Sequence, residues 1–240
     1  MSGEKSQPSR LRLNRERVLR SAVGLADSSG VESLSMRKLA AELCVVPMAL
    51  YKHVANKEEL LDGMVDILIG EIDPPLIGAE WKDAVRHRIL SARRMLQRHQ
   101  WARRVFETRT TKTPGVLAYM DSFIGIFISA GFTVDLTHHV MHAIGSRMWG
   151  FTQELFEEPP GHPEEAPGEM GEAELAMLQE MARRYPNIMR VATASAHEQD
   201  SVVGTGCDDQ FEFEFALDLL LDGIERLHAR GWSSRPAAPR

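Results

Sequence analysis

The stretch that decides the fold is 35-SMRKLAAELCVVPMALYKHVANK-57. Leucine and alanine recur at helical spacing on both sides of Cys44-Val45-Val46, which predicts two short helices joined by a tight turn. Ser35 is placed to cap the first helix with its hydroxyl, and Pro47 opens the second where its missing N–H does no harm. Asn56, with an acidic residue three positions later, makes a capping-box-like start for another helix. The stretch therefore predicts a helix-turn-helix unit.

The second helix of this unit carries a surface of small, apolar, aromatic and basic residues. Its leading residues, Pro47, Met48 and Ala49, offer no bidentate hydrogen bonds to bases but suit thymine methyl groups in a major groove. Four residues are better placed for phosphates or adjacent base edges: Tyr51, Lys52, His53 and Lys57. Phosphate contacts set register rather than sequence. A plain helical hairpin with a solvated basic face remains the alternative from this pattern alone.

The charge of the chain is unevenly distributed. The 240 residues carry a net charge of −6, yet residues 1–57 hold ten Lys/Arg and five acidic residues, which gives +5 and leaves −11 for the rest. This segregation indicates a basic contact module joined to an acidic body, because DNA affinity depends on the local contact surface. Chance variation between the two parts is the plain alternative.

The rest of the chain also reads as helical, and no alternating strand pattern is present. Asp73-Pro74-Pro75 predicts a domain boundary, and Gly131-Phe132 predicts the bend that ends a long apolar helix. The expected helices are 14–27, 35–43, 47–53, 57–70, 81–97, 101–107, 114–130, 133–157, 172–184, a short segment after 186, and 211–230. We therefore expect an all-α protein with a flexible arm at 1–13, a small domain at 14–72, a larger domain at 76–232 and a flexible tail at 233–240. For residues 1–13 the alternative is a basic arm that touches phosphates or reaches a minor groove.

Composition excludes several classes of protein. The longest apolar runs are too short to span a bilayer and the N-terminus has no apolar signal segment, so we expect a cytoplasmic protein without membrane contact. Cys44 and Cys207 are too few for a disulfide framework or a thiolate metal site and are expected to be buried thiols. No GxSxG, HExxH or Walker sequence is present, so an enzyme is a weaker alternative. An α-helical module that binds a small molecule or a partner without DNA would not explain the charge asymmetry.

The larger domain contains candidates for binding a small hydrophobic molecule. Apolar candidates are Trp101, Phe106, Phe127, Met141 and Trp149. Polar candidates are Thr108, Arg109, His138, His142 and Glu154. His138 and His142 share one helix face with His139 nearby, but pocket or interface roles are favoured over a metal site. We predict no cofactor and no metal, although metal binding by this cluster stays open.

Residues 21–69, with SMRKLAAELCVV, ALYKHV and NKEELLD, closely resemble the tetracycline-repressor (TetR) family of bacterial transcriptional regulators. The C-terminal FEFEFALDLLLDGIERL and the Gly131-Phe132 bend resemble that family's ligand domain. The resemblance implies an all-α homodimer with two helix-turn-helix DNA-binding heads. A small-molecule inducer in the C-terminal ligand-binding and dimerisation domain would change head separation and release the operator.

Transferred by position, the resemblance places the family's base-contacting helix on residues 47–53 and its phosphate contacts on Tyr51 and Lys57. Its base- and backbone-facing arginine falls on Arg37, which with Ser35 joins the predicted DNA-binding set. Cys44 stands where many members have glycine, so its backbone is expected to have negative φ or to be strained. Val105 stands where the tetracycline repressor has a metal-binding histidine, which implies a different inducer.

The apolar faces of the last helix and of the helix at 133–157 are too extensive for one subunit to cover. We therefore expect them to form a four-helix interface in a homodimer. Two-fold symmetry then requires a palindromic double-stranded operator.

Overall fold

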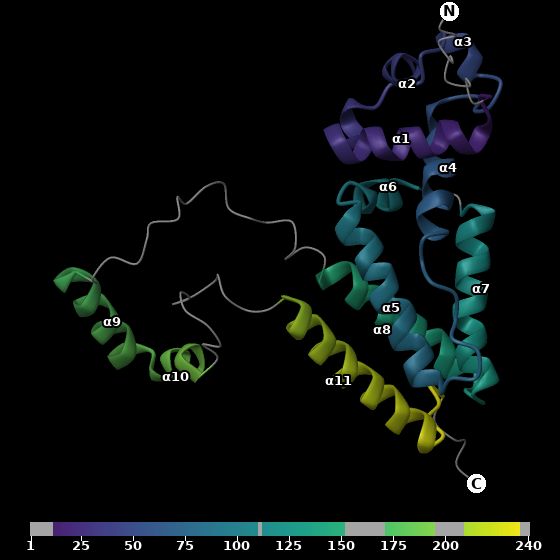
Figure 1. The fold of residues 1–240 in the computed structure, drawn as a ribbon. Coiled ribbons are helices and arrows are strands. Elements are labelled where there is room, and N and C mark those ends of the chain that lie inside the picture. The colour runs from purple at the N-terminus through teal and green to yellow at the C-terminus, as the bar shows by residue number, and fades with distance from the viewer. Residues whose placement is uncertain (1–11, 110–111, 152–170, 195–208, 236–240) are drawn as a thin grey trace, which may run out of the picture. The chain divides into compact units, whose positions relative to one another are not determined.

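The computed structural model describes residues 12–109, 112–151, 171–194 and 209–235, and every regular element in these ranges is helical (Figure 1). The predicted all-α class is confirmed. The chain divides into two compact units: unit 1 comprises Met1–Met141 with Ser233–Arg240, and unit 2 comprises His142–Trp232. The predicted boundary at Asp73 falls inside unit 1, in the connection between the fourth and fifth helices.

The described residues of unit 1 form seven α-helices, one 3₁₀ turn and the start of an eighth α-helix. They are α1 (Arg15–Ser29), the 3₁₀ turn η1 (Val31–Ser33), α2 (Met36–Glu42), α3 (Pro47–Leu50), α4 (Lys57–Ile69), α5 (Trp81–Arg98), α6 (Ala102–Thr108), α7 (Pro114–Ser129) and the start of α8 (Val134–Phe151). Unit 2 contains the rest of α8 together with α9 (Glu172–Arg184), α10 (Pro186–Ala194) and α11 (Asp209–Ala229).

Helix α1 is defined by its ends and by its packing on α4. The Asn14 side chain accepts a hydrogen bond from the Arg17 N–H at 2.8 Å, and Gly30 ends the helix with φ +78°. Gly63 of α4 lies so close to α1 that an added Cβ would be 2.5 Å from a methyl group of Leu19. The absence of a side chain at Gly63 therefore sets how closely the two helices pack.

An aromatic cluster of residues from α5, from α7 and from the turn after α7 forms part of the core. Phe127 is fully buried, and its ring lies 5.9 Å from Trp81 and 5.3 Å from Phe132 between centroids. Gly131 adopts φ +84°, and the Phe132 N–H donates to the Phe127 carbonyl at 3.1 Å. This glycine turn ends α7 at the predicted bend and folds Phe132 back onto the core.

The start of the predicted flexible tail is held in place. The Asp135 carboxylate accepts hydrogen bonds from the Ser234 N–H and hydroxyl, both at 2.7 Å, and from the Ser233 hydroxyl at 3.1 Å. Residues 236–240 lie outside the described part of the chain.

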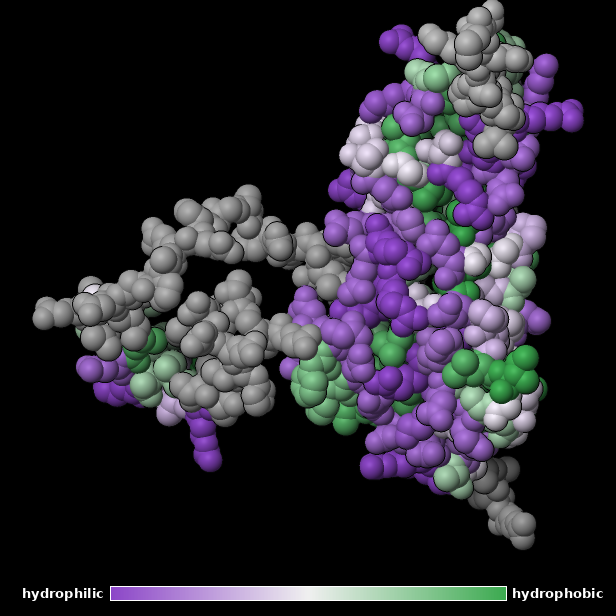
Figure 2. Space-filling model, viewed as in Figure 1, coloured by the Kyte–Doolittle hydropathy of each residue, from purple (hydrophilic) through white to green (hydrophobic). Residues whose placement is uncertain are grey.

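The face of the described residues seen in Figure 2 is mostly hydrophilic, with hydrophobic side chains gathered in a few patches. None of the described helices is long and apolar enough to cross a membrane.

Candidate nucleic-acid interface

The predicted helix-turn-helix is present as α2, a three-residue turn and α3. Ser35 caps α2 by accepting from the Lys38 N–H at 3.2 Å. The Cys44 N–H donates to the Ala41 carbonyl at 3.0 Å and the Val45 N–H to the Ala40 carbonyl at 2.9 Å. Cys44 has φ +54°, so the turn is a Schellman motif with cysteine in the left-handed position.

Cys44 was expected to have either a negative φ or a strained backbone, and its conformation decides between the two. The backbone does not take negative φ; it takes the left-handed conformation that costs a side-chain-bearing residue about 1–2 kcal/mol. The prediction that Cys44 is a buried thiol is wrong, because the side chain is exposed at the outer side of this turn. Cys207 lies outside the described residues.

The inner face of the unit is closely packed. Leu39, Ala40, Leu50 and Val54 are at most 1 % exposed, while Val45 is half-buried. Helix α3 ends at Leu50, earlier than predicted. The Leu50 carbonyl accepts from the N–H groups of both His53 and Val54, at 2.8 and 3.0 Å, so a tight turn follows α3 in place of further helix.

The outer face presents the predicted DNA-binding side chains. Met48 is 71 % exposed and Tyr51 44 % exposed. Six more of the predicted residues are exposed or half-buried on this unit: Ser35, Arg37, Pro47, Ala49, Lys52 and His53. Lys57 is exposed at the first position of α4, after the Asn56 cap that accepts from the Glu59 N–H at 2.8 Å.

The cations of this outer face are available to a partner. Within the described residues, Arg37, Lys52 and Lys57 form no ion pair shorter than 4 Å. An exposed cation that is not held in a short ion pair can neutralise a phosphate.

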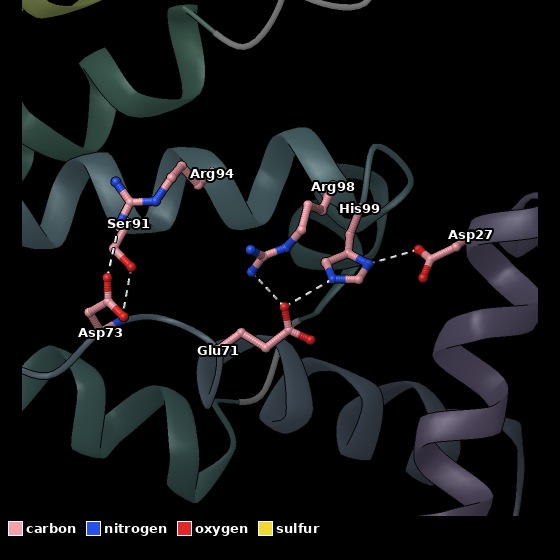
Figure 3. A network of polar contacts seen from close by, with 7 residues as sticks. All are labelled: Asp27, Glu71, Asp73, Ser91, Arg94, Arg98 and His99. Carbon is pink, nitrogen blue, oxygen red and sulfur yellow. Dashed lines mark hydrogen bonds and ion pairs between the residues drawn. The ribbon is translucent and has the colours of Figure 1, made fainter.

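The opposite side of the first four helices is joined to α5 and α6 by polar contacts (Figure 3). Asp27 of α1 accepts from the Trp101 indole N–H at 2.6 Å and lies 2.7 Å from His99 Nδ1. The other imidazole nitrogen of His99 lies 3.1 Å from Glu71, which also accepts from Arg98 at 2.8 Å. The His99 side chain is 9 % exposed, so this junction is largely closed to water.

A second set of contacts joins α4 to the connection between α6 and α7. Arg109 forms ion pairs with Glu58 at 2.6 Å and Asp62 at 3.3 Å. One helical turn further on, Asp66 accepts from the Thr113 hydroxyl at 2.5 Å. Burial opposes the charge on Arg109, but hydrogen bonds to Glu58 and Asp62 raise the pKa of its guanidinium above the ordinary value.

The connection between α4 and α5 is fixed at Asp73. Its N–H donates to the Ser91 hydroxyl at 2.8 Å, and its carboxylate accepts from Arg94 at 2.9 Å (Figure 3). A side-chain hydrogen bond from the Ser91 hydroxyl to the Asp73 carboxylate is the main cause that holds the pKa of Asp73 below its ordinary value. The buried Arg88 adds a hydrogen bond of 3.0 Å to the Asp73 carbonyl.

The predicted ligand-binding residues are spread over several environments. Trp101 and Arg109 make the junction contacts described above, and Phe127 lies in the aromatic core. Phe106 is half-buried, and Thr108 is exposed with its hydroxyl donating to the Val105 carbonyl at 2.9 Å. Binding of a ligand by these five residues stays a prediction.

The remaining candidates lie on or beyond α8. Met141 is half-buried, whereas His138 and His142 are exposed. The side chain of Trp149 and the whole of Glu154 lie outside the described residues. Within the described ranges, no three His, Cys, Asp or Glu side chains form a group that suits a metal ion.

Sequence reasoning missed the contact between Asp27 and His99. These residues are 72 positions apart, and neither belongs to a motif. The only local signal is that His99 follows the last residue of α5, where a polar side chain is free to reach another element.

Comparison with known proteins agrees with this geometry. The family model described as "Tetracyclin repressor-like, C-terminal domain" matches residues 74–228. An HTH-type transcriptional regulator of Saccharopolyspora erythraea is 35% identical over 130 residues, which cover 54% of this chain and 55% of that protein. The HTH-type transcriptional repressor DrrR1 of Streptomyces coeruleorubidus is 29% identical over 91% of this chain and 79% of its own length.

The fold has a close counterpart among solved structures. The structure of apo ActR from Streptomyces coelicolor superposes with a TM-score of 0.70 at 22% identity, over 92% of this chain and 99% of that one. The chain spans about half the length of the first relative and most of the length of the other two. Because the family model covers well over half of the sequence and the helix-turn-helix precedes it, the chain belongs to the tetracycline-repressor-like (TetR) family.

Proposed function

We propose that the protein is a ligand-responsive transcriptional repressor, active in the cytoplasm, that binds a palindromic DNA operator as a homodimer. The observation that carries this proposal is the outer face of the helix-turn-helix. There Arg37, Lys52 and Lys57 are exposed, as is Met48, and within the described residues the three cations form no ion pair shorter than 4 Å. Such a surface attracts a phosphate backbone on two sides of an inserted helix.

Different residues of this face suit contacts to phosphates and contacts to base edges. Lys52, Lys57 and the Tyr51 hydroxyl suit phosphates, and Lys57 stands at the first position of α4, where the helix dipole also favours an anion. Met48 and Ala49 bring only apolar groups to the base edges. Sequence preference then depends on thymine methyl groups and on DNA shape.

The dimer is supported by α11. Phe211, Phe215 and Leu219 follow each other at four-residue spacing and are 61 %, 53 % and 58 % exposed. A stripe of this kind on one helix face needs an apolar cover. A second copy supplies it and gives the two heads the symmetry of a palindrome. A monomer in light scattering at micromolar concentration would contradict this part of the proposal.

The response to a ligand is proposed from the family and from the contacts between the first four helices and α5–α7. A hydrophobic inducer has to bind one head position better than another in order to shift the population. The Asp27–His99 and Asp66–Thr113 contacts join α1 and α4 to the rest of unit 1, so they are suited to carry such a shift.

The experiment is a salt titration of binding to random-sequence duplex DNA, followed by selection of a preferred duplex from a random library. Affinity should fall with salt with a slope that reports several phosphates. Lys57→Ala and Tyr51→Ala should weaken binding to all duplexes alike, whereas Met48→Gln should change the preferred sequence. No binding at low salt would reject the DNA function and favour a helical module that acts without DNA.

A further inference from the structure

Val46, the residue immediately before α3, is exposed although its side chain is aliphatic. The side chain is 68 % exposed. Over residues 12–75, all of which the structure describes, the only other exposed large apolar or aromatic side chains are those of Met48 and Tyr51. Exposed apolar side chains scattered over a surface need no explanation, but these three fall within six residues of the helix-turn-helix. The exposed apolar surface of this part of the chain is therefore concentrated at the start of α3.

Val46 also occupies a position where an aliphatic residue does not favour the helix. It is the N-cap residue of α3, and its side chain makes no cap hydrogen bond. The N-cap residues of α1, α2 and α4 are Asn14, Ser35 and Asn56, and each accepts a hydrogen bond from a main-chain N–H. An aliphatic residue in place of such a cap weakens a helix. Of these four helices, only α3 departs from the local preference, and such departures are expected at functional positions.

The main chain restricts the direction of the Val46 side chain. The residue before a proline is held in extended conformations, and Val46 has φ −76° and ψ +144°. Its carbonyl accepts from the Ala49 N–H at 2.9 Å, and the N–H of Val45 before it donates to the Ala40 carbonyl at 2.9 Å. Branching at Cβ restricts χ1 further. Val46 therefore presents its two methyl groups in a nearly fixed direction and has little conformational entropy to lose on binding.

We propose that Val46 contacts the C5-methyl group of a thymine and helps to select the operator sequence. The second helix of a helix-turn-helix enters the major groove with its leading residues against base edges, and Val46 lies directly before Pro47 and Met48. The thymine methyl is the only methyl group that a base edge presents in that groove, so an aliphatic side chain can distinguish thymine by it. The inference rests on the proposed DNA function and adds a specificity-determining residue that the predicted DNA-binding set does not contain.

The first test removes single methyl groups from the DNA. A preferred duplex is selected with the full-length wild-type protein, and each thymine of one half-site is replaced in turn by deoxyuridine, which lacks only the C5-methyl group. At one position this replacement should weaken wild-type binding about fourfold, as expected for the loss of one buried methyl group. Val46→Ala should lose the sensitivity at that position and keep it at any thymine that Met48 contacts. Val134→Ala, which shortens a valine that is 76 % exposed at the start of α8, is the matched control and should keep the fourfold difference.

Val46→Ser separates the contact to DNA from the stability of the fold. Its hydroxyl can cap α3, so the midpoint of thermal unfolding should rise, while the loss of both methyl groups should remove the same sensitivity to deoxyuridine. Unchanged sensitivity in Val46→Ala and Val46→Ser would overturn this inference and leave the repressor intact. A selected half-site without thymine, or wild-type binding that is insensitive to deoxyuridine at every position, would also overturn it. Absence of any wild-type binding to duplex DNA at low salt would instead reject the proposed function.

Discussion

The two sides of the first four helices use charge in opposite ways. On the outer side, Arg37, Lys52 and Lys57 are exposed without ion pairs in the described chain. On the side that faces α5–α7, acids such as Asp27 and Glu58 are paired with groups of the larger part of unit 1. Folding therefore engages acids on one side and leaves cations on the other. The basic character of residues 1–57 is greater at the outer surface than the net charge indicates.

The two sides should also differ in what mutations change. Paired groups at a closed junction contribute to the free energy of unfolding, whereas exposed cations contribute little to it. The outer face should therefore affect DNA binding with little effect on stability, and the junction should affect stability first.

The largest expected change in the free energy of unfolding is that of Asp27→Ala. It removes the acceptor of the Trp101 indole N–H and the partner of His99 Nδ1, two groups that are largely buried. Leaving them without partners should lower the free energy of unfolding by about 3 kcal/mol. Urea denaturation measures this loss. Lys52→Ala on the outer face is the control and should change stability by less than about 0.5 kcal/mol. Equal effects of the two variants would remove the distinction between the sides.

A smaller loss of stability is expected from Gly63→Ala, which tests the packing of α1 on α4. The added methyl group would lie 2.5 and 2.9 Å from the two methyl carbons of Leu19, so the helices have to separate or Leu19 has to move. Such overpacking should cost about 1–3 kcal/mol in thermal or urea unfolding.

Gly24→Ala is the matched control for this variant. An added Cβ at Gly24 has no described neighbour within 4 Å, and the residue lies inside α1. Higher helix propensity should therefore stabilise that variant by up to about 1 kcal/mol. A Gly63→Ala protein as stable as Gly24→Ala would show that the two helices are not closely packed.

The smallest effect is expected from acid titration of Asp73. Its pKa is lowered in the folded state, chiefly by the hydrogen bond with Ser91, so its contribution to stability is present above the unfolded value of about 3.9 and is lost as pH falls through the folded value. Ser91→Ala should move the carboxyl pKa, followed by NMR, back toward the ordinary value. The unfolding midpoint should then depend less on pH below about 4. An unchanged Asp73 titration in this variant would show that Ser91 does not set the shift.

Local chemistry in the sequence predicts where several helices begin. Ser35, Asn14 and Asn56 each cap a helix as expected, because a cap depends on residues within three positions. Gly131 ends α7 for a similarly local reason, since glycine alone takes positive φ at no cost. These local sequence signals are sufficient to predict the all-α class of the fold and the position of the helix-turn-helix.

No local sequence pattern predicts the contacts between residues far apart in the chain. Arg109 is a plausible ligand contact from sequence, yet in the structure Glu58 and Asp62 of α4 engage it. Trp101 has the composition of a pocket residue, but its indole N–H is bonded to Asp27, 74 positions away. Helical periodicity shows that such residues face inward. It does not show which element they meet.

The Schellman turn at Cys44 has a consequence for how the protein can evolve. The direction in which the chain enters α3 is held by main-chain hydrogen bonds from Cys44 and Val45, and the Cys44 side chain lies outside. Residues 47–49 take no part in those bonds. If the proposed DNA function holds, substitutions there alter the surface offered to DNA while the scaffold that orients it stays the same, so new operator preferences can arise without a change of fold.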